Sequence, residues 1–315
     1  MKLLFGHGYL GSRIARLWRA AGQEAAVVTR SPAKADELRS LGYQAIVADV
    51  CDPATLTNLP PAETVVFAVG YDRRTAAEHS IGEVYAGGVR HVLDAVQGSG
   101  FSVQGSQSKA LSNSEPRTLN PKLFVYISST GVYGDADGDW VDEATPCRPL
   151  REGGRACLAA EQAITMHPLG GNAVVLRLAG IYGPGRLPRS EALQRGEPID
   201  APKDGFLNLI HVDDAARSVL RVEALIDSDR LAPPQTYCVA DGRPGLRRDY
   251  YAELARLLGA PPPRFVDPAA DSPAAARAAA DKRISNAKLL REVGVEFEYP
   301  SYREGLAAIV AGRAS

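Results

Sequence analysis

Short apolar runs alternate with amphipathic stretches along the first 180 residues of the chain. Between the first two runs, Leu10, Ile14 and Leu17 recur with helical spacing, and Gly22 is typical of a helix end. Because a repeated order of strand, helix and strand requires right-handed crossovers, the pattern predicts an α/β fold with a doubly wound parallel sheet. The six runs that predict its strands cover residues 2–5, 25–29, 45–48, 64–68, 123–128 and 173–177.

Two segments depart from this alternation. Residues 98–121 contain fifteen Gly, Ser, Pro, Asn or Gln at 24 positions, which is typical of a flexible surface insertion. Beyond Gly183, repeated prolines break the pattern and indicate a second, smaller unit. We therefore expect a sheet domain and a C-terminal lobe, formed respectively by residues 1–180 with about 204–227, and by about 181–203 with 228–315.

Composition and charge argue against several classes of protein. Lys and Arg total 36 and Asp and Glu total 37, so the chain has no cationic excess for a nucleic acid. No apolar run approaches the roughly 18 residues that cross a bilayer, and the first predicted strand begins directly at the N-terminus. We therefore expect a cytoplasmic protein without a membrane partner. The four cysteines form no CxxC and the five histidines no HExxH, which argues against a metal site.

A glycine-rich turn follows the first predicted strand and opens the first predicted helix. Gly6, Gly8 and Gly11 form a GxGxxG motif in the context that dinucleotide binding requires. Gly6 permits the tight turn, Gly8 lets the backbone approach a pyrophosphate, and Gly11 allows helix and strand to pack closely. The free N–H groups of the helix N-terminus then attract the phosphates. The motif predicts a cofactor site of the Rossmann type, which also includes Tyr9 and Leu10.

The residues after the second strand indicate which dinucleotide binds. A site for NAD usually has Asp or Glu there, whereas this chain has Arg30 and Ser31 and no acid before Asp36. A guanidinium and a hydroxyl suit the 2′-phosphate of NADP, so the sequence favours NADP over NAD and leaves NAD as the alternative. The ends of the third and fourth strands complete the predicted cofactor site with Asp49, Val50, Ala68, Val69 and Gly70.

Three further motifs carry a family resemblance. The chain reads ISSTGVYG at residues 127–134, LRLAGIYGPG at 176–185 and IHVDD at 210–214. With the glycine-rich turn, these motifs make nearly the whole chain resemble the extended short-chain dehydrogenase/reductases of the NAD-dependent epimerase/dehydratase family. The resemblance implies a Rossmann domain that binds NAD(P), a small C-terminal substrate lobe, and an active site between them. Family members often pair through a four-helix bundle, so the resemblance is compatible with a homodimer.

The chain departs from the chemistry of the family that it resembles. Family members use a Ser or Thr, a Tyr and, four residues later, a Lys that lowers the pKa of the Tyr. The Ser position matches Ser129, but the Tyr and Lys positions hold Gly153 and Cys157. Because residues 134–181 contain no Tyr and residues 123–202 contain no Lys, a shifted alignment does not restore the pair. The chain is therefore most similar to atypical family members that lack the YxxxK pair.

Few candidates remain for the chemistry. Ser129 is the retained family residue. Tyr133 is a candidate proton donor, and since no Lys lies in the adjacent motif, we expect its pKa to stay at about 10. Tyr182 and Arg186 are expected to contact the substrate, with Arg186 suited to an anionic group. We expect an oxidoreductase-like enzyme that acts on a nucleotide sugar or another small carbonyl or hydroxy compound by a non-standard proton path. The alternative is a non-catalytic NAD(P)-binding sensor or regulatory protein, because loss of Tyr and Lys spares phosphate binding.

Overall fold

Seven parallel strands form one sheet at the centre of the structure, a computed structural model that describes residues 1–72, 78–97, 120–269, 272, 274–275 and 279–312. Neighbouring strands follow the order β3-β2-β1-β4-β5-β7-β12, so the chain starts in the middle and winds outward in both directions. The strands are β1 (Lys2–Phe5), β2 (Ala25–Thr29), β3 (Gln44–Val47), β4 (Thr64–Phe67), β5 (Leu123–Ser129), β7 (Ala173–Leu178) and β12 (Gln235–Val239).

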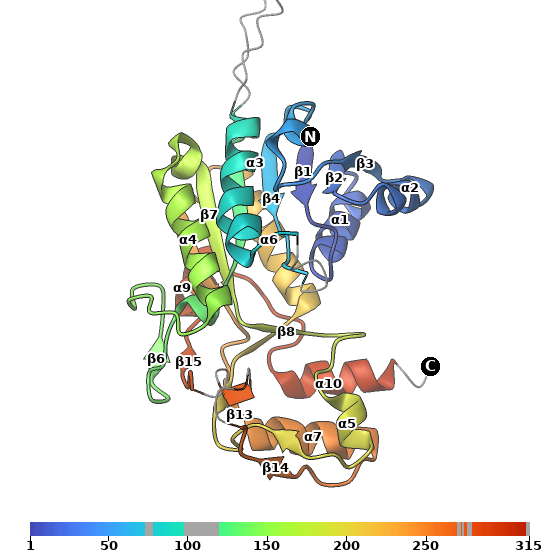
Figure 1. Ribbon diagram of the computed structural model, residues 1–315, viewed down its shortest axis with the longest axis vertical. Helices are drawn as coiled ribbons and strands as arrows, with labels where there is room; N and C mark the ends of the chain where they lie inside the picture. Colours follow the sequence, from blue (N-terminus) through green and yellow to red (C-terminus); the bar gives the residue numbers. More distant parts are fainter. Residues whose placement is uncertain (73–77, 98–119, 270–271, 273, 276–278, 313–315) are drawn as a thin grey trace, which may run out of the picture.

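Helices cover both faces of the sheet, because strand side chains alternate between two apolar cores (Figure 1). Leu4 of β1 belongs to the same core as Ile14 on one face, and its neighbour Leu3 belongs to the core of Val89 on the other. The first face carries α1 (Gly11–Ala20), α2 (Pro32–Ser40), α6 (Val212–Asp227) and α9 (Ala287–Val293). The second face carries α3 (Gly88–Val96) and α4 (Glu152–Met166).

A smaller lobe lies beyond the carboxyl ends of the strands (Figure 1). It has its own apolar core, in which Tyr182, Tyr250, Leu254 and Leu306 are buried. Its helices are α5 (Ser190–Gln194), α7 (Arg247–Leu258) and α10 (Tyr302–Ala311). Short strands pair as β8 (Gly180–Tyr182) with β11 (Leu209–His211), β9 (Ile199–Asp200) with β14 (Phe265–Val266), β10 (Phe206–Leu207) with β13 (Gly245–Leu246), and β6 (Trp140–Val141) with β15 (Arg283–Ile284).

Four short helical turns complete the described elements. The one that concerns the site is η3 (Glu83–Gly87), a π-helical turn that runs directly into α3. Isolated π-helical turns are rare in proteins, and those that occur are often found at functional sites. The others are the 3₁₀ turns η1 (Pro53–Leu56), η4 (Thr130–Val132) and η5 (Pro168–Asn172).

The predicted doubly wound sheet is confirmed, but the predicted boundary of the lobe is wrong. Residues 228–315 are expected in the lobe from the sequence, whereas β12 is an edge strand of the central sheet and pairs with β7. Leu289 and Val293 of α9 belong to the same core as Tyr237 of β12, so α9 also belongs to the sheet domain. Residues 98–119 of the predicted insertion lie outside the described part. Within the described ranges, no helix is long and apolar enough to span a membrane.

Candidate functional site: a cavity at the ends of the central strands

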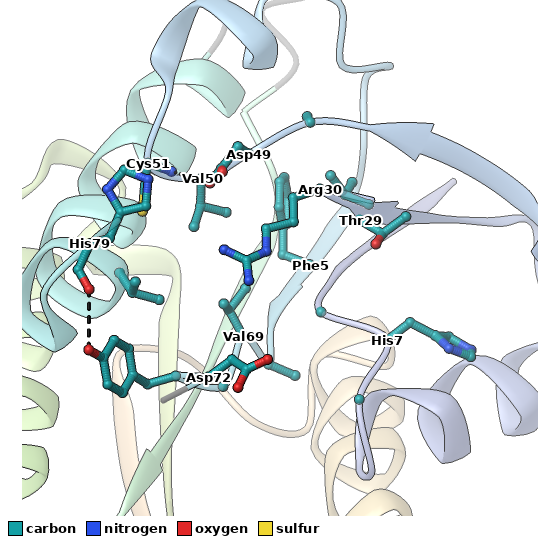
Figure 2. Close-up of a pocket in the computed structure, with 18 of the residues that line it drawn as sticks. Phe5, His7, Thr29, Arg30, Asp49, Val50, Cys51, Val69, Asp72 and His79 are labelled. Carbon is teal, nitrogen blue, oxygen red and sulfur yellow. Dashed lines mark hydrogen bonds between the residues drawn. The ribbon is translucent and has the colours of Figure 1, made fainter. Parts of the chain in front are cut away.

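A cavity of about 700 Å³ opens at the carboxyl ends of β1, β2, β3 and β4 (Figure 2). Doubly wound proteins bind nucleotides at this edge of the sheet, where the strand order reverses. Leu10, Gly11 and Ser31 are the predicted cofactor residues that do not line the cavity. Nine predicted cofactor residues do line it: Gly6, Gly8, Tyr9, Arg30, Asp49, Val50, Ala68, Val69 and Gly70.

The glycine turn forms one wall of the cavity. Gly6 has a φ of +94°, and a Cβ atom there would lie 2.7 Å from the Ala68 carbonyl oxygen, so only glycine fits. A Cβ atom on Gly11 would collide with the Gly6 carbonyl oxygen, so α1 packs closely on the turn because Gly11 has no side chain. Around Gly8, no atom of the described residues lies within 4 Å of the Cβ position. This open space can receive a pyrophosphate.

Leu10, Gly11 and Ser31, the predicted residues outside the lining, lie next to residues that do line the cavity. The Leu10 side chain is buried in the core against α1, so any contact of Leu10 or Gly11 with a cofactor uses the backbone N–H groups. Ser31 is the N-cap of α2, and its Oγ accepts a hydrogen bond from the Lys34 N–H at 3.2 Å. The hydroxyl of Ser31 therefore fixes the start of α2 next to Arg30.

Arg30 extends into the cavity from the end of β2. Figure 2 shows its guanidinium turned inward, toward the side of the cavity that carries Val69 and Asp72. Its Nη1 lies 3.7 Å from Glu78 Oε2, and both side chains are exposed, so the ion pair contributes little stability. The structure thus has a cation where the sequence predicts contact with a 2′-phosphate.

The end of β3 forms a fixed wall. Asp49 Oδ1 accepts a hydrogen bond from the Cys51 N–H at 2.8 Å, and the Val50 carbonyl oxygen lies 2.8 Å from His91 Nδ1. Burial, with the nearby Asp49 carboxylate, raises the pKa of Cys51 to about 11. The Cys51 thiol therefore stays protonated at neutral pH and is a poor nucleophile.

Sequence reasoning missed several polar residues of the lining, among them His7, Tyr71 and His79. His7 Nε2 is buried without a hydrogen-bond partner among the described residues, and burial followed by the charge of Lys34 lowers its pKa. The Tyr71 hydroxyl donates a hydrogen bond to the His79 carbonyl oxygen at 3.2 Å, the dashed line in Figure 2. Tyr71 directly follows Gly70, so reading the end of the fourth strand one residue further finds it.

Tyr9 joins the glycine turn to the lobe. Its hydroxyl donates a hydrogen bond to the Pro184 carbonyl oxygen at 3.1 Å. Its ring lies under the guanidinium groups of Arg13 and Arg186, at 4.2 and 5.3 Å from the ring centroid. Arg186 lines the cavity, and its expected contact with a substrate stays a prediction.

Tyr182 does not have the predicted position. Its side chain is fully buried in the core of the lobe, and its hydroxyl donates a hydrogen bond to the Ser301 carbonyl oxygen at 3.2 Å. A Cβ atom on Gly305 of α10 would collide with this hydroxyl. The expected substrate contact of Tyr182 is therefore wrong, because its side chain packs β8 against α10.

The two predicted catalytic residues lie outside the lining of the cavity. Ser129 is half-buried, and its Oγ accepts a hydrogen bond from the Gly131 N–H at 3.0 Å, which leaves its own proton available. Tyr133 is only 2% exposed, and its hydroxyl accepts a hydrogen bond from Arg177 at 2.8 Å and lies 3.2 Å from Cys238 Sγ. Burial and then Cys238 raise the pKa of Tyr133 well above the expected value. Tyr133 is a core residue, which corrects its prediction as the proton donor.

A buried ion pair lies under this loop. Arg177 Nη2 of β7 donates to Glu161 Oε2 of α4 at 2.6 Å, and the Ser128 hydroxyl donates to the other carboxylate oxygen at 2.5 Å. From the C-terminal segment, Lys282 Nζ donates to the Gly134 carbonyl oxygen at 3.0 Å. These contacts fix the position of the ISSTGVYG segment relative to α4, β7 and the C-terminal segment.

Gly153 and Cys157 lie one turn apart at the start of α4. A Cβ atom on Gly153 would have only Ile81 Cδ1, at 3.8 Å, as a described neighbour within 4 Å, so this position is roomy. Cys157 is 6% exposed, and burial raises its pKa to about 11, opposed by a hydrogen bond with Tyr126. The thiol of Cys157 therefore stays protonated at neutral pH and is a poor nucleophile, and Gly153 has no side chain to donate a proton.

Comparisons with known proteins identify the family. A model of the NAD-dependent epimerase/dehydratase family matches residues 3–240. The chain belongs to this family. Protein YeeZ of Escherichia coli K12 is 29% identical over 305 residues, which cover 94% of this chain and 95% of YeeZ. A 3-diazoavenalumate denitrifying reductase of a Streptomyces species is 26% identical over 328 residues, which cover 95% of this chain and 96% of the reductase.

A solved structure of an epimerase shares the fold. The UDP-glucose 4-epimerase of Thermus thermophilus, in complex with NAD, superimposes with a TM-score of 0.74 at 18% identity, over 99% of this chain and 98% of the epimerase. As a member of the epimerase/dehydratase family, the chain has an NAD-binding fold of the oxidoreductase type. Its own cavity has open space at Gly8 and a cation at Arg30, features that a dinucleotide can use.

Proposed function

We propose that the protein is an NADP(H)-dependent oxidoreductase that acts on a small carbonyl or hydroxy compound, nucleotide sugars included. The observation that carries the proposal is Arg30, whose guanidinium turns into the cavity from the end of β2. A carboxylate there would accept hydrogen bonds from ribose hydroxyls, whereas a guanidinium pairs with a 2′-phosphate. Glu78, at 3.7 Å from Arg30, is an exposed partner that a phosphate dianion can replace.

The reaction that this proposal implies is hydride transfer, which the cofactor supplies through its nicotinamide ring. Ser129 can orient a substrate oxygen with its free proton, since its Oγ accepts only from the Gly131 N–H among the described residues. Arg186 offers a cation from the lobe to an anionic group of the substrate. Similarity to a Streptomyces protein named as a reductase supports reduction as the direction of the reaction.

Titration calorimetry with NADP+, NAD+ and 2′,5′-ADP tests the assignment of Arg30. A charge-assisted contact is worth about 1.5–3 kcal/mol, so we expect the parent protein to bind NADP+ roughly ten- to a hundredfold more tightly than NAD+. Arg30→Ala should remove this preference and leave the affinity for NAD+ unchanged. Arg16→Ala, on the exposed side of α1, is the matched control. Equal affinities of the parent protein for NADP+ and NAD+ would contradict the proposal.

A second candidate function is a non-catalytic NAD(P)-binding sensor or regulatory protein. The observation that favours it is the pair of Gly153 and Cys157 on α4, which take the places of the family's Tyr and Lys, whereas the glycine turn still lines the cavity. The two functions separate on turnover. NADPH oxidation with aldehyde and quinone probes that falls in Ser129→Ala supports the enzyme, whereas tight NADPH binding without oxidation supports the sensor.

A further inference from the structure

The hydroxyl groups of the tyrosines around the cavity can be accounted for one by one. Tyr9 and Tyr71 donate their protons to backbone carbonyl oxygens, of Pro184 and His79 respectively. Tyr85 differs, because its hydroxyl accepts a hydrogen bond from the Tyr71 N–H at 3.2 Å. A phenol that accepts one bond still has its own proton to donate, and no described residue accepts the proton of Tyr85.

Tyr85 also differs in burial from two other tyrosines near Gly153 and Cys157, the positions of the family's Tyr and Lys. Tyr85 is half-buried. Tyr126 is 1% exposed and forms a hydrogen bond with Cys157. Tyr133 is 2% exposed and bonded to Arg177, as described above. Both are closed off from a substrate, whereas Tyr85 keeps part of its surface accessible.

The position of Tyr85 joins the cofactor cavity to the start of α4. It lies on the π-helical turn η3, directly after Val84, which lines the cavity, and its hydroxyl meets the N–H of Tyr71, another lining residue. On the other side, Ile81 of the same segment is the neighbour of Gly153. Cys157 is close enough to affect the ionisation of Tyr85. The turn that carries Tyr85 therefore lies between the cavity and the start of α4, where the family tyrosine is missing.

We propose that Tyr85 is the proton donor of this protein, in place of the tyrosine that is missing from α4. This inference rests on the proposed function. With NADPH as the hydride donor, oxidised to NADP+, hydride addition reduces the carbonyl carbon and forms a C–H bond there. The electron pair of the broken C=O π bond stays on the oxygen, which then takes the proton of the Tyr85 hydroxyl. The Tyr71 N–H stabilises the phenolate that remains, and water returns the proton.

The protonation state of Tyr85 agrees with a donor. Burial raises the pKa of Tyr85, opposed by the hydrogen bond from the Tyr71 N–H, so the hydroxyl holds its proton at neutral pH. A phenol is a much stronger acid than the aliphatic hydroxyl of Ser129, which is therefore left to orient the substrate oxygen.

The formation of a sulfite adduct on bound NADP+ tests this proposal without a known substrate. Sulfite adds through its sulfur lone pair to C4 of the nicotinamide, and the proposal requires its oxygens to accept a hydrogen bond from Tyr85, as a substrate oxygen would. In Tyr85→Phe, we expect NADP+ to bind within about twofold of the parent protein. Adduct formation, followed by its dihydropyridine absorbance, should weaken about ten- to a hundredfold, as loss of a hydrogen bond to a charged group implies. Tyr126→Phe, which removes the same hydroxyl from the buried neighbour, should form the adduct like the parent protein.

Each other outcome is decisive. Unchanged adduct affinity in Tyr85→Phe, or no adduct on the NADP+ complex of the parent protein, overturns the role of Tyr85. An equal loss of NADP+ and sulfite affinity also overturns it, since Tyr85 then merely holds the Tyr71 loop. Absence of NADP+ binding in the parent protein is a different failure, because it removes the proposed function itself.

Discussion

At the scale of single residues, Gly8 and Gly11 lie in the same turn but lack a side chain for different reasons. A side chain on Gly11 would collide with the Gly6 carbonyl oxygen, so the absence of a Cβ atom there serves the fold. The Cβ position of Gly8 faces open space, so the fold itself has no need of glycine at this position. We therefore expect the glycine at position 8 to serve ligand binding rather than folding.

Substitution of Gly8 separates binding from folding. Gly8→Val places two methyl groups where a pyrophosphate approaches. We therefore expect the dissociation constant of NADP+, measured by calorimetry, to rise at least a hundredfold above that of the parent protein. The thermal midpoint should change little. Gly171→Val is the matched control, because its Cβ position is equally open but lies in η5, outside the cavity. Retained NADP+ affinity in Gly8→Val would show that the turn does not bind the dinucleotide.

Single residues of the site differ in how far the sequence reveals them. The sequence predicts the place of the glycines, of Arg30 and of the strand ends, because each directly follows a predicted strand. The carboxyl ends of neighbouring parallel strands then meet at one edge of the sheet. The setting of Tyr133 does not follow, because its partners Arg177 and Cys238 are 44 and 105 residues away in the chain. Tyr85 carries no motif at all, and its role emerges only from the hydrogen bond to Tyr71.

At the scale of elements, α4 is attached to the sheet by a buried charge. Glu161 and Arg177 are 7% and 8% exposed, and the Ser128 hydroxyl and the Tyr133 hydroxyl complete their hydrogen bonds. Such a pair contributes little net stability over an apolar pair, but removing one partner leaves an uncompensated buried charge. We therefore expect the pair to fix the position of α4 on β5 and β7 more than to add to the free energy of folding.

Removal of one partner should be costly. In Arg177→Leu, we expect the free energy of unfolding to fall by about 3–5 kcal/mol in chemical denaturation, because Glu161 stays buried without its counter-ion. Lys34→Ala is the control, since its ion pair with Glu37 on α2 is exposed and should be worth less than about 1 kcal/mol. A loss in Arg177→Leu as small as in the control would mean that water reaches Glu161.

Two elements show why the fold is only partly predictable from the sequence. The strands β1, β2 and β4 are continuous apolar runs between turn residues, and the structure has them within one residue of the prediction. The strand β12 reads QTYCV and begins with two polar residues, so it does not stand out as an apolar run after the irregular segment. It becomes a strand because β7 offers an unpaired edge and α9 covers it, both of which are tertiary effects.

At the scale of the whole molecule, a buried carboxylate lies where the sheet domain meets the lobe. Asp241 follows β12 and is 7% exposed, and one of its oxygens has no hydrogen-bond partner among the described residues. Burial raises its pKa to about 7. The charges that act on it are those of Arg243 on its own segment, Glu304 of α10 and Asp214 of α6.

The sign of the resulting pH dependence follows from linkage. An unfolded Asp ionises near pH 4, whereas folded Asp241 holds its proton up to about pH 7, so unfolding releases a proton between these values. The free energy of unfolding should therefore fall as the pH rises from about 4 to 7, by at most about 4 kcal/mol from this group. Chemical denaturation of Asp241→Asn at several pH values should give a free energy of unfolding that falls less between about pH 4 and 7 than that of the parent protein. Asp227→Asn, at the exposed end of α6, should keep the slope of the parent protein.

The position of β12 has a consequence for biosynthesis. A ribosome releases β1 to β7 first, and β7 then waits with an unpaired edge until residue 239 has been made. The apolar surface that α9 covers stays open until residue 293. Nascent chains of intermediate length therefore present an aggregation-prone strand edge, and the sheet domain can be completed only after the lobe segment between β8 and β11 has already emerged. Chaperone dependence should be greatest in this interval of translation.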